Sequence, residues 1–248
     1  SNLYKVPAQA HLAERLVGLT FADTMFFTNS GVEAIECAVK TCRRHQFVEG
    51  HPEKYRIVTF SNAFHGRTMT AISATNQDKM RGGFEPLPDW FTVLPFDDLT
   101  AVQDFMAGPL ADSVGGFMVE PIQGEGGVRP ASKAFLQGLR DLADKHGALL
   151  IFDEVQCGVG RTGHLFAYEY FGVTPDMITT AKGLTNGSIP MGAVFASNAI
   201  HDAFMHGPAG AIECAIDRPA SGHADLPAPP TRGLALVCHP NPTQGGTM

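Results

Sequence analysis

Short apolar runs alternate with helix-patterned segments from Arg56 to Thr180, and this alternation constrains the fold more strongly than any other feature of the sequence. The candidate strands are residues 56–60, 91–95, 115–119, 148–152 and 177–180. An amphipathic helix is expected over 134–145, where His146 and Gly147 stop it. Strands separated in this way are typical of a parallel sheet with helices on its faces. We therefore predict an α/β fold with a mostly parallel sheet and flanking helices.

Two more amphipathic helices are expected before this region, over residues 9–19 and 32–48, with a short apolar run at 25–27 between them. The second helix follows Asn29, Ser30 and Gly31. A helix that begins after small polar residues presents unpaired N–H groups at the positive end of its dipole, which suits a phosphate group. An ordinary N-cap by Ser30 or Asn29 explains the same residues. Both interpretations stay open at this point.

The composition is that of an ordinary globular protein, with 44% hydrophobic and 17% charged residues among 248. A formal net charge of -7 argues against nucleic acid or an anionic membrane as a partner. No apolar run is long enough to span a bilayer. The five cysteines form no CxxC pair and no metal-ligand spacing, which predicts no metal site and fits a reducing cytoplasm. The start, SNLY, is not a signal peptide, and without an initiator Met it suggests that the chain begins inside a longer protein.

Charged residues follow two of the predicted strands. Asp153 and Glu154 end the run at 148–152, and Lys182 follows the run at 177–180. Buried carboxylates are costly unless a partner compensates them, and strand carboxyl ends are where α/β sheets bind ligands. Pyridoxal phosphate needs both groups, because its pyridine nitrogen requires an anion and its aldehyde a lysine. The simpler alternative is that Lys182 is a surface lysine.

Two other loops carry residues suited to a ring-shaped, charged ligand. Phe64, His65 and Arg67 follow the strand at 56–60, where an aromatic ring can stack and an arginine can pair with a carboxylate. Glu120 and Glu125 lie in a glycine-rich loop after 115–119 and could do acid–base work. A core phenylalanine, a solvated arginine and a solvated connector are the alternatives.

The sequence GVGRTG at 158–163 matches the G-x-G-x-x-G pattern of dinucleotide-binding proteins. That pattern should open a helix directly after a strand, with an acidic residue about 20 positions later. Here five residues intervene after the apolar run, and the nearest suitable acid, Asp176, follows Pro175. A dinucleotide-binding oxidoreductase is therefore kept only as a third hypothesis.

Five segments in this order resemble the class III pyridoxal-phosphate aminotransferases: TNSGVEA, NAFHGRT, VEPIQGEGG, IFDEVQCGVGRTG and TTAKGL. SNLY and FHGRTMTAISAT are similar to acetylornithine-type enzymes, whereas AKGLTNGSIPMGAV is similar to ω-amino-acid:pyruvate transaminases. The resemblance covers residues 1–206. It implies an incomplete large domain of the fold-type-I pyridoxal-phosphate-dependent transferases, cytoplasmic, with an active site that the family builds at a homodimer interface.

The resemblance also implies roles for individual residues. Lys182 would form the Schiff base with pyridoxal 5'-phosphate and then move the substrate proton, and Asp153 would pair with the pyridine nitrogen. Gln156 would hydrogen-bond the phenolic oxygen, and Phe64 or His65 would stack on the ring. The phosphate would bind at Ser30, Gly31 and Val32, although the family usually has Thr or Ala where this chain has Val32.

On the substrate side, the resemblance implies that Arg67 holds the α-carboxylate and that Glu120 and Glu125 lie near the substrate. The expected reaction is transamination of a basic or ω-amino donor, acetylornithine-like, with a 2-oxo acid as acceptor.

The pattern changes after about residue 206. Residues 220–231 are rich in Pro, Ala and Ser, and RGLALVCHPNPTQGGTM resembles the first strands of a small α/β-hydrolase. The nucleophile motif of that class, G-x-S-x-G, is absent, so hydrolase activity is set aside. We expect 207–248 to be a foreign or irregular tail on a truncated or composite chain. The second hypothesis is accordingly an inactive fragment that binds pyridoxal phosphate weakly or not at all.

Overall fold

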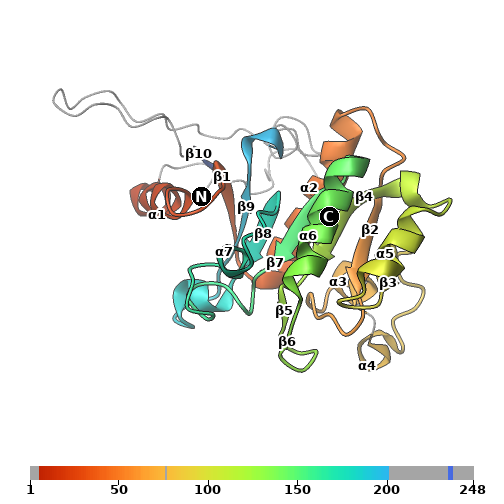
Figure 1. The fold of residues 1–248 in the computed structure, drawn as a ribbon. Helices are drawn as coiled ribbons and strands as arrows, with labels where there is room; N and C mark the ends of the chain where they lie inside the picture. The colour runs from red at the N-terminus through yellow and green to blue at the C-terminus, as the bar shows by residue number, and fades with distance from the viewer. Residues whose placement is uncertain (1–5, 76, 201–233, 237–248) are drawn as a thin grey trace, which may run out of the picture.

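A mostly parallel sheet forms the centre of the molecule (Figure 1). The computed structural model describes residues 6–75, 77–200 and 234–236. The strands of the sheet are β1 (Thr24–Thr28), β2 (Arg56–Phe60), β3 (Phe91–Leu94), β4 (Val114–Val119), β7 (Leu149–Asp153), β8 (Met177–Thr180), β9 (Gly192–Ala196) and β10 (Leu234–Leu236). Their order is β10-β1-β9-β8-β7-β4-β2-β3. All neighbours pair in parallel except β9, which is antiparallel to both β1 and β8. The predicted α/β class is confirmed.

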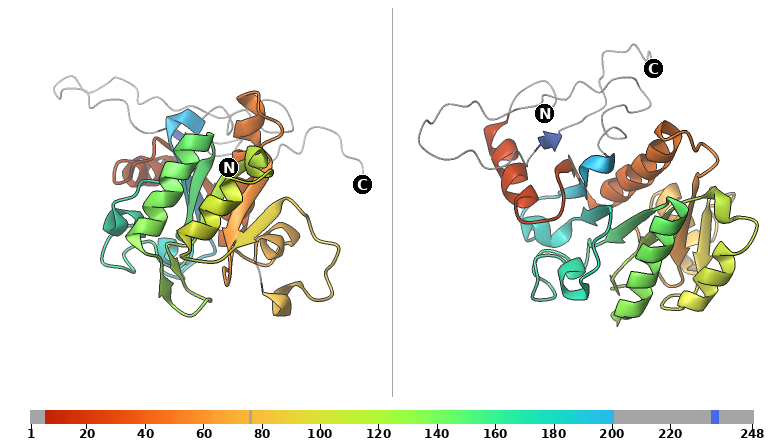
Figure 2. Two further views of the ribbon diagram at one scale, coloured as in Figure 1. Left: turned by 45° about the vertical axis from the view of Figure 1, so that its right-hand side comes forward. Right: turned by 45° about the horizontal axis from the view of Figure 1, so that its top comes forward.

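Helices cover both faces of this sheet. The helices of the described residues are α1 (Pro7–Val17), α2 (Gly31–Val48), α3 (Met69–Ala74), α4 (Asp78–Arg81), α5 (Leu99–Met106), α6 (Lys133–His146) and α7 (Ala167–Phe171), with the 3-10 turns η1 (Ala111–Ser113), η2 (Lys182–Thr185) and η3 (Asn198–Ile200). The short helix α4 has no buried residue and packs beside α3. The helices α5 and α6 lie side by side in front of the sheet in Figure 1 and in the left view of Figure 2. A separate hairpin joins β5 (Ile122–Gln123) to β6 (Arg129–Pro130).

Alternation along the strands divides the core into two clusters. In β2, Ile57 packs in the cluster that contains α2, whereas Val58 and Phe60 pack in the cluster that contains α6. The rings of Phe60 and Phe135 meet edge to face at 5.1 Å. Because successive side chains of a strand point to opposite faces, a strand covered on both sides is apolar throughout. This explains why the strands appear in the sequence as continuous apolar runs.

Capping residues set the ends of the long helices close to where the sequence predicts them. The hydroxyl of Ser30 accepts a hydrogen bond from the Glu33 N–H at the start of α2, and Ser132 caps α6 in the same way. The left-handed Gly147, with φ of 60°, ends α6. Gly18 follows the last residue of α1, so that helix ends before the predicted Leu19.

Several elements were not predicted from the sequence. The antiparallel strand β9, the β5–β6 hairpin and the helix α5 carry no distinctive periodicity because each is short or contains few polar–apolar alternations. The prediction for residues 207–248 lies outside the described residues, apart from β10, which pairs in parallel with β1. In the described part of the chain, no helix is both long and apolar enough to cross a membrane.

Candidate functional site

The direction of the strands brings the ends of β1, β2, β4, β7 and β8 to one edge of the sheet. The strands β2, β4, β7 and β8 are mutually parallel, and β9 reverses direction once between β8 and β1. In Figure 1 the β5–β6 hairpin, which follows β4, and the cyan turn of η2, which follows β8, lie on the same lower side. All the segments that carry predicted site residues therefore leave the sheet at this edge.

Asp153 is the most constrained carboxylate at this edge. It is the last residue of β7 and is 4% exposed. Its Oδ2 lies 2.7 Å from Nδ1 of His65, and its Oδ1 accepts hydrogen bonds from the Thr179 hydroxyl at 3.2 Å and the Val155 N–H at 3.1 Å. Donors on both oxygens fix the orientation of the carboxylate and compensate the loss of water.

His65 is buried behind Asp153, with no side-chain exposure. Burial alone lowers its pKa, but the hydrogen bond and charge of Asp153, together with the charge of Glu120, raise the pKa overall. The histidine thus tends to carry a proton that it shares with Asp153. Its Nε2 atom has no hydrogen-bond partner among the described residues. The structure therefore makes His65 a partner of the carboxylate, while the neighbouring Phe64 is half-buried.

Glu120 follows β4 and is also buried, with 3% exposure. Its Oε1 accepts the Phe64 N–H at 2.8 Å and its Oε2 accepts the Gly124 N–H at 3.2 Å. Burial raises the pKa of Glu120 to about 7; the charge of Asp153 adds to this, while His65 and the two backbone hydrogen bonds oppose it. The carboxyl group joins the loop after β2 to the loop after β4.

Gln156 reaches into the same region from the loop after β7. A Cβ atom on Gly124 would collide with the Gln156 side-chain amide, so the glycine is needed for this close approach. The Nε2 atom of Gln156 is buried without a hydrogen-bond partner in the described part of the chain. Buried polar atoms in proteins are usually paired, so this atom marks a place where a ligand could supply an acceptor.

The turn before α2 packs against the two loops that carry Asp153 and Lys182. A Cβ atom on Gly31 would lie 3.0 Å from Cγ1 of Val155 and 3.2 Å from Cβ of Ala181. Val32 packs under Gly66, whose φ of 125° suits glycine. The first N–H groups of a helix have no intrahelical acceptor, so the start of α2 offers amide donors here.

Lys182 is the first residue of η2 and is exposed. Its φ of 44° places a non-glycine residue in the left-handed region, where backbone strain is tolerated chiefly at functional positions. Asp153 of β7 pairs in register with Thr179 of β8. Lys182 follows Thr179 by three residues. The arrangement brings an amine and a fixed carboxylate to adjacent strand ends.

Arg67 and Glu125 are exposed on the loops after β2 and β4. Among the described residues, neither side chain forms an ion pair within 4.0 Å. They are therefore accessible to a solvent-borne charged molecule, unlike the buried Glu120.

One contributor at this edge, Thr179, was not predicted from the sequence; its hydroxyl donates to Asp153. Glu154, which follows Asp153, is buried and accepts the N–H groups of Ala167 and Tyr168 at the start of α7, so it ties the turn after β7 to that helix. Burial raises the pKa of Glu154 to about 7. Thr179 could be found only from the pairing of β7 with β8, since nothing in a short apolar strand distinguishes it.

The GVGRTG segment does not form a dinucleotide-binding turn. Residues 158–163 are turns and bends, and the next helix, α7, begins only at Ala167. Val159 and Gly160 both have positive φ, and the Gly160 N–H bonds the Leu165 carbonyl. No helix N-terminus follows the strand directly, so the context that the motif requires is missing.

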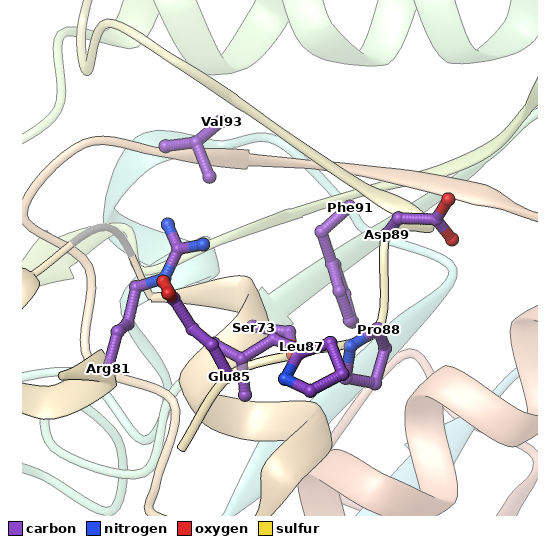
Figure 3. A pocket seen from close by; sticks show the side chains of 9 residues that line it. Ser73, Arg81, Glu85, Leu87, Pro88, Asp89, Phe91 and Val93 are labelled. Atoms are coloured by element: carbon purple, nitrogen blue, oxygen red, sulfur yellow. The ribbon is translucent and has the colours of Figure 1, made fainter. Parts of the chain in front are cut away.

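A cleft of about 790 Å³ lies elsewhere, beside the edge strand β3 (Figure 3). Arg81, Glu85 and Asp89 contribute charged groups to it, and Phe91 belongs to β3. None of the predicted site residues lines this cleft. The cluster around Asp153 is the better candidate site, because it gathers the predicted site residues around a buried carboxylate held by three hydrogen bonds.

Comparison with known proteins points to one family. The family model described as aminotransferase class-III matches residues 1–212. The acetylornithine aminotransferase of Mesorhizobium japonicum is 52% identical over 198 residues, which are 80% of this chain and 48% of that protein. The chain thus spans about half the length of the curated relatives it matches.

Two solved structures share the fold. An (S)-enantioselective omega-transaminase from Thermomicrobium roseum superposes with a TM-score of 0.76 at 32% identity, over 80% of this chain and 49% of its own. An amine transaminase from an uncultivated Pseudomonas species, in its PLP-bound form, has a TM-score of 0.76 at 29% identity, over 83% and 51% respectively.

Proposed function

The chain belongs to the aminotransferase class III family, and on this basis we propose that it binds pyridoxal 5'-phosphate and transfers an amino group from a basic or ω-amino donor to a 2-oxo acid. The observation that carries the proposal is the fixed, buried Asp153 at the strand end next to the one that leads to Lys182. The PLP-bound Pseudomonas transaminase, which shares the fold, supports the choice of cofactor.

The residues at the sheet edge fit this cofactor. Gln156 presents a buried amide nitrogen without a partner among the described residues, and the start of α2 presents free amide donors. Gly31 and Gly124 keep the backbone close, since a Cβ atom at either position would meet neighbouring side chains. The residues present therefore include donors for a phosphate and for a phenolic oxygen, and Asp153 is an acceptor for a protonated ring nitrogen.

Asp153 would keep a proton on the ring nitrogen. The three hydrogen bonds on its carboxylate hold it in one orientation, and His65 supplies a positive partner behind it. When bound, pyridoxal phosphate supplies an electron sink for the carbanion formed at the substrate Cα. Because the structure uses His65 as a partner of Asp153, we assign ring stacking to Phe64.

Lys182 would supply the amine that holds the cofactor and then carry the proton at the substrate Cα. Ser30, Gly31 and Val32 would bind the phosphate through the start of α2, where the dipole favours an anion. Gln156 would donate its unpaired Nε2–H to the phenolic oxygen.

Arg67 would hold the substrate carboxylate, and Glu125 would contact the distal amine of the donor. Both are exposed at the edge of the site, and their charges complement those two groups. The curated relatives named acetylornithine aminotransferase support an acetylornithine-like donor. We also propose a second copy of the chain as partner and a cytoplasmic location, by resemblance to the family.

The proposal is tested by the half-reaction. Protein saturated with pyridoxal phosphate is mixed with N-acetylornithine, and conversion of the cofactor to pyridoxamine phosphate is followed in the visible spectrum. We expect conversion that depends on Lys182 and that is faster with N-acetylornithine than with alanine. Saturated protein that converts no basic or ω-amino donor would favour the alternative of an inactive fragment.

A further inference from the structure

We infer that Glu120 is a positioning residue, a double acceptor that locks the Phe64 loop to the Gly124 turn and so sets the place of the stacking ring and of Gln156. The inference rests on the proposed function, because it assigns Glu120 a task in building the cofactor site. It replaces the direct substrate contact that the sequence resemblance implies for this residue.

The contacts of Glu120 are divided between two loops. Its Oε1 accepts from Phe64, which follows β2, and its Oε2 accepts from Gly124, which follows β4. These two amides belong to residues 60 positions apart in the sequence, and Glu120 is the shared acceptor of both. The side chain is 3% exposed, so a substrate in the solvent has little access to it.

The two loops carry groups that the proposed site requires. Phe64 is the candidate stacking ring, and the next residue, His65, bonds Asp153. Gly124 lies against the Gln156 amide, leaving no space for a Cβ atom between them. A shift of either loop therefore displaces Phe64 or Gln156 relative to Asp153.

Only a carboxylate can make this link with one side chain. It offers an acceptor oxygen to each loop, whereas an amide offers one acceptor and one donor. In Glu120→Gln, the NH₂ group would face a backbone N–H, and one of the two links would be lost. Two acceptor oxygens on one buried side chain, each at hydrogen-bond distance from a different loop, are more than a space-filling role would require.

Glu154 provides a matched control. It is fully buried, accepts two backbone N–H groups and has its pKa raised to about 7 by burial, as Glu120 does. Its two donors, Ala167 and Tyr168, both belong to α7, so it ties the turn after β7 to α7 and does not join the Phe64 loop to the Gly124 turn. Glu154→Gln therefore removes a comparable buried double acceptor without loosening that link.

The first test needs no cofactor. Amide hydrogen exchange is compared between the unchanged protein, Glu120→Gln and Glu154→Gln. We expect Glu120→Gln to speed exchange at Phe64 or Gly124 by about tenfold or more, the factor that corresponds to losing a buried hydrogen bond, while Glu154→Gln does so only at the start of α7. Unchanged exchange at both Phe64 and Gly124 would overturn the inference, whether or not the protein binds pyridoxal phosphate.

The second test measures the affinity and the visible spectrum of pyridoxal phosphate at the site. In Glu120→Gln, we expect pyridoxal phosphate to dissociate about tenfold more readily and the pH midpoint of its bound visible band to shift, because Phe64 and Gln156 move. Glu154→Gln should lower the melting temperature by a similar amount with an unshifted band. If both variants lower the melting temperature alike and neither changes the band or the affinity, Glu120 is only structural and the inference fails. If the unchanged protein binds no cofactor, the proposed function fails. Hydrogen exchange alone then tests whether Glu120 holds the Phe64 loop to the Gly124 turn.

Discussion

Single residues at the strand ends determine the chemistry of the proposed site. Asp153 and Lys182 are recognisable in the sequence because each interrupts an apolar or turn-rich context with a charge. The partners of Asp153 are not recognisable, since His65 is 88 positions away and Thr179 is 26 positions away. Their contacts depend on the order of β2, β4, β7 and β8 in the sheet. Sequence patterns predict the strands but not which strands become neighbours.

Gly124→Ala tests the close approach of a loop to Gln156. The added Cβ atom would collide with the Gln156 amide, so either the loop or the amide must move. Overpacking of this kind costs about 1–3 kcal/mol, and we expect pyridoxal phosphate to bind about tenfold more weakly. The measurement is a fluorescence titration with pyridoxal phosphate. Gly82→Ala, where the nearest neighbour of the new Cβ lies at 3.4 Å, is the control and should leave the affinity unchanged.

At the scale of elements, N-capping residues stabilise the starts of two helices, and at one of them we also propose the phosphate site. Ser30 caps α2 and Ser132 caps α6, each accepting one backbone N–H. The sequence predicts both helices within one or two residues of their ends, because their apolar faces follow the helical period. Whether a cap also binds an anion cannot be predicted from the capping pattern, since the same residues satisfy both tasks.

Ser30→Ala and Ser132→Ala separate the two tasks. Each variant loses one N-cap, so we expect each to lower the free energy of unfolding by about 1 kcal/mol in urea denaturation. Only Ser30→Ala should also weaken pyridoxal phosphate, since only Ser30 lies beside the proposed phosphate amides. Equal cofactor affinity in the two variants would show that the Ser30 hydroxyl serves α2 alone.

At the scale of the whole molecule, the sheet edge concentrates buried ionisable groups. Glu120 and Glu154 both have a pKa raised from 4.5 to about 7, chiefly by burial. The parallel α/β class is predictable from alternating strands and helices, but this concentration is not, because it follows from the strand order, in which β4 and β7 are neighbours. The described portion of residues 207–248, β10, likewise pairs with β1 at a position that its sequence does not indicate.

The raised pKa values of Glu120 and Glu154 predict how the free energy of unfolding changes with pH. Between pH 4.5 and about 7 the folded chain keeps protons on Glu120 and Glu154 that the unfolded chain releases. The stabilisation from their raised pKa is therefore fully present below pH 4.5 and is lost as the pH rises through about 7. We expect the free energy of unfolding to fall over this range, with His65 acting in the same direction because its pKa is also raised.

Glu154→Gln isolates one of these contributions. Its amide does not titrate, so the fall in unfolding free energy between pH about 5 and about 8 should be shallower than in the unchanged protein. The measurement is urea denaturation at a series of pH values. Glu14→Gln, at an exposed position of α1, is the control. An identical pH slope in Glu154→Gln and the unchanged protein would mean that Glu154 does not titrate in this range.

The most direct test of the account is to find which residue holds the cofactor. Protein incubated with pyridoxal phosphate is reduced with borohydride, digested, and analysed by peptide mass spectrometry, with Lys182→Ala treated in parallel. We predict that the reduced cofactor remains on the peptide that contains Lys182 and that Lys182→Ala retains none. Equal retention by Lys182→Ala, or cofactor spread over other lysines, would contradict the assignment of Lys182 and Asp153 as the centre of the site.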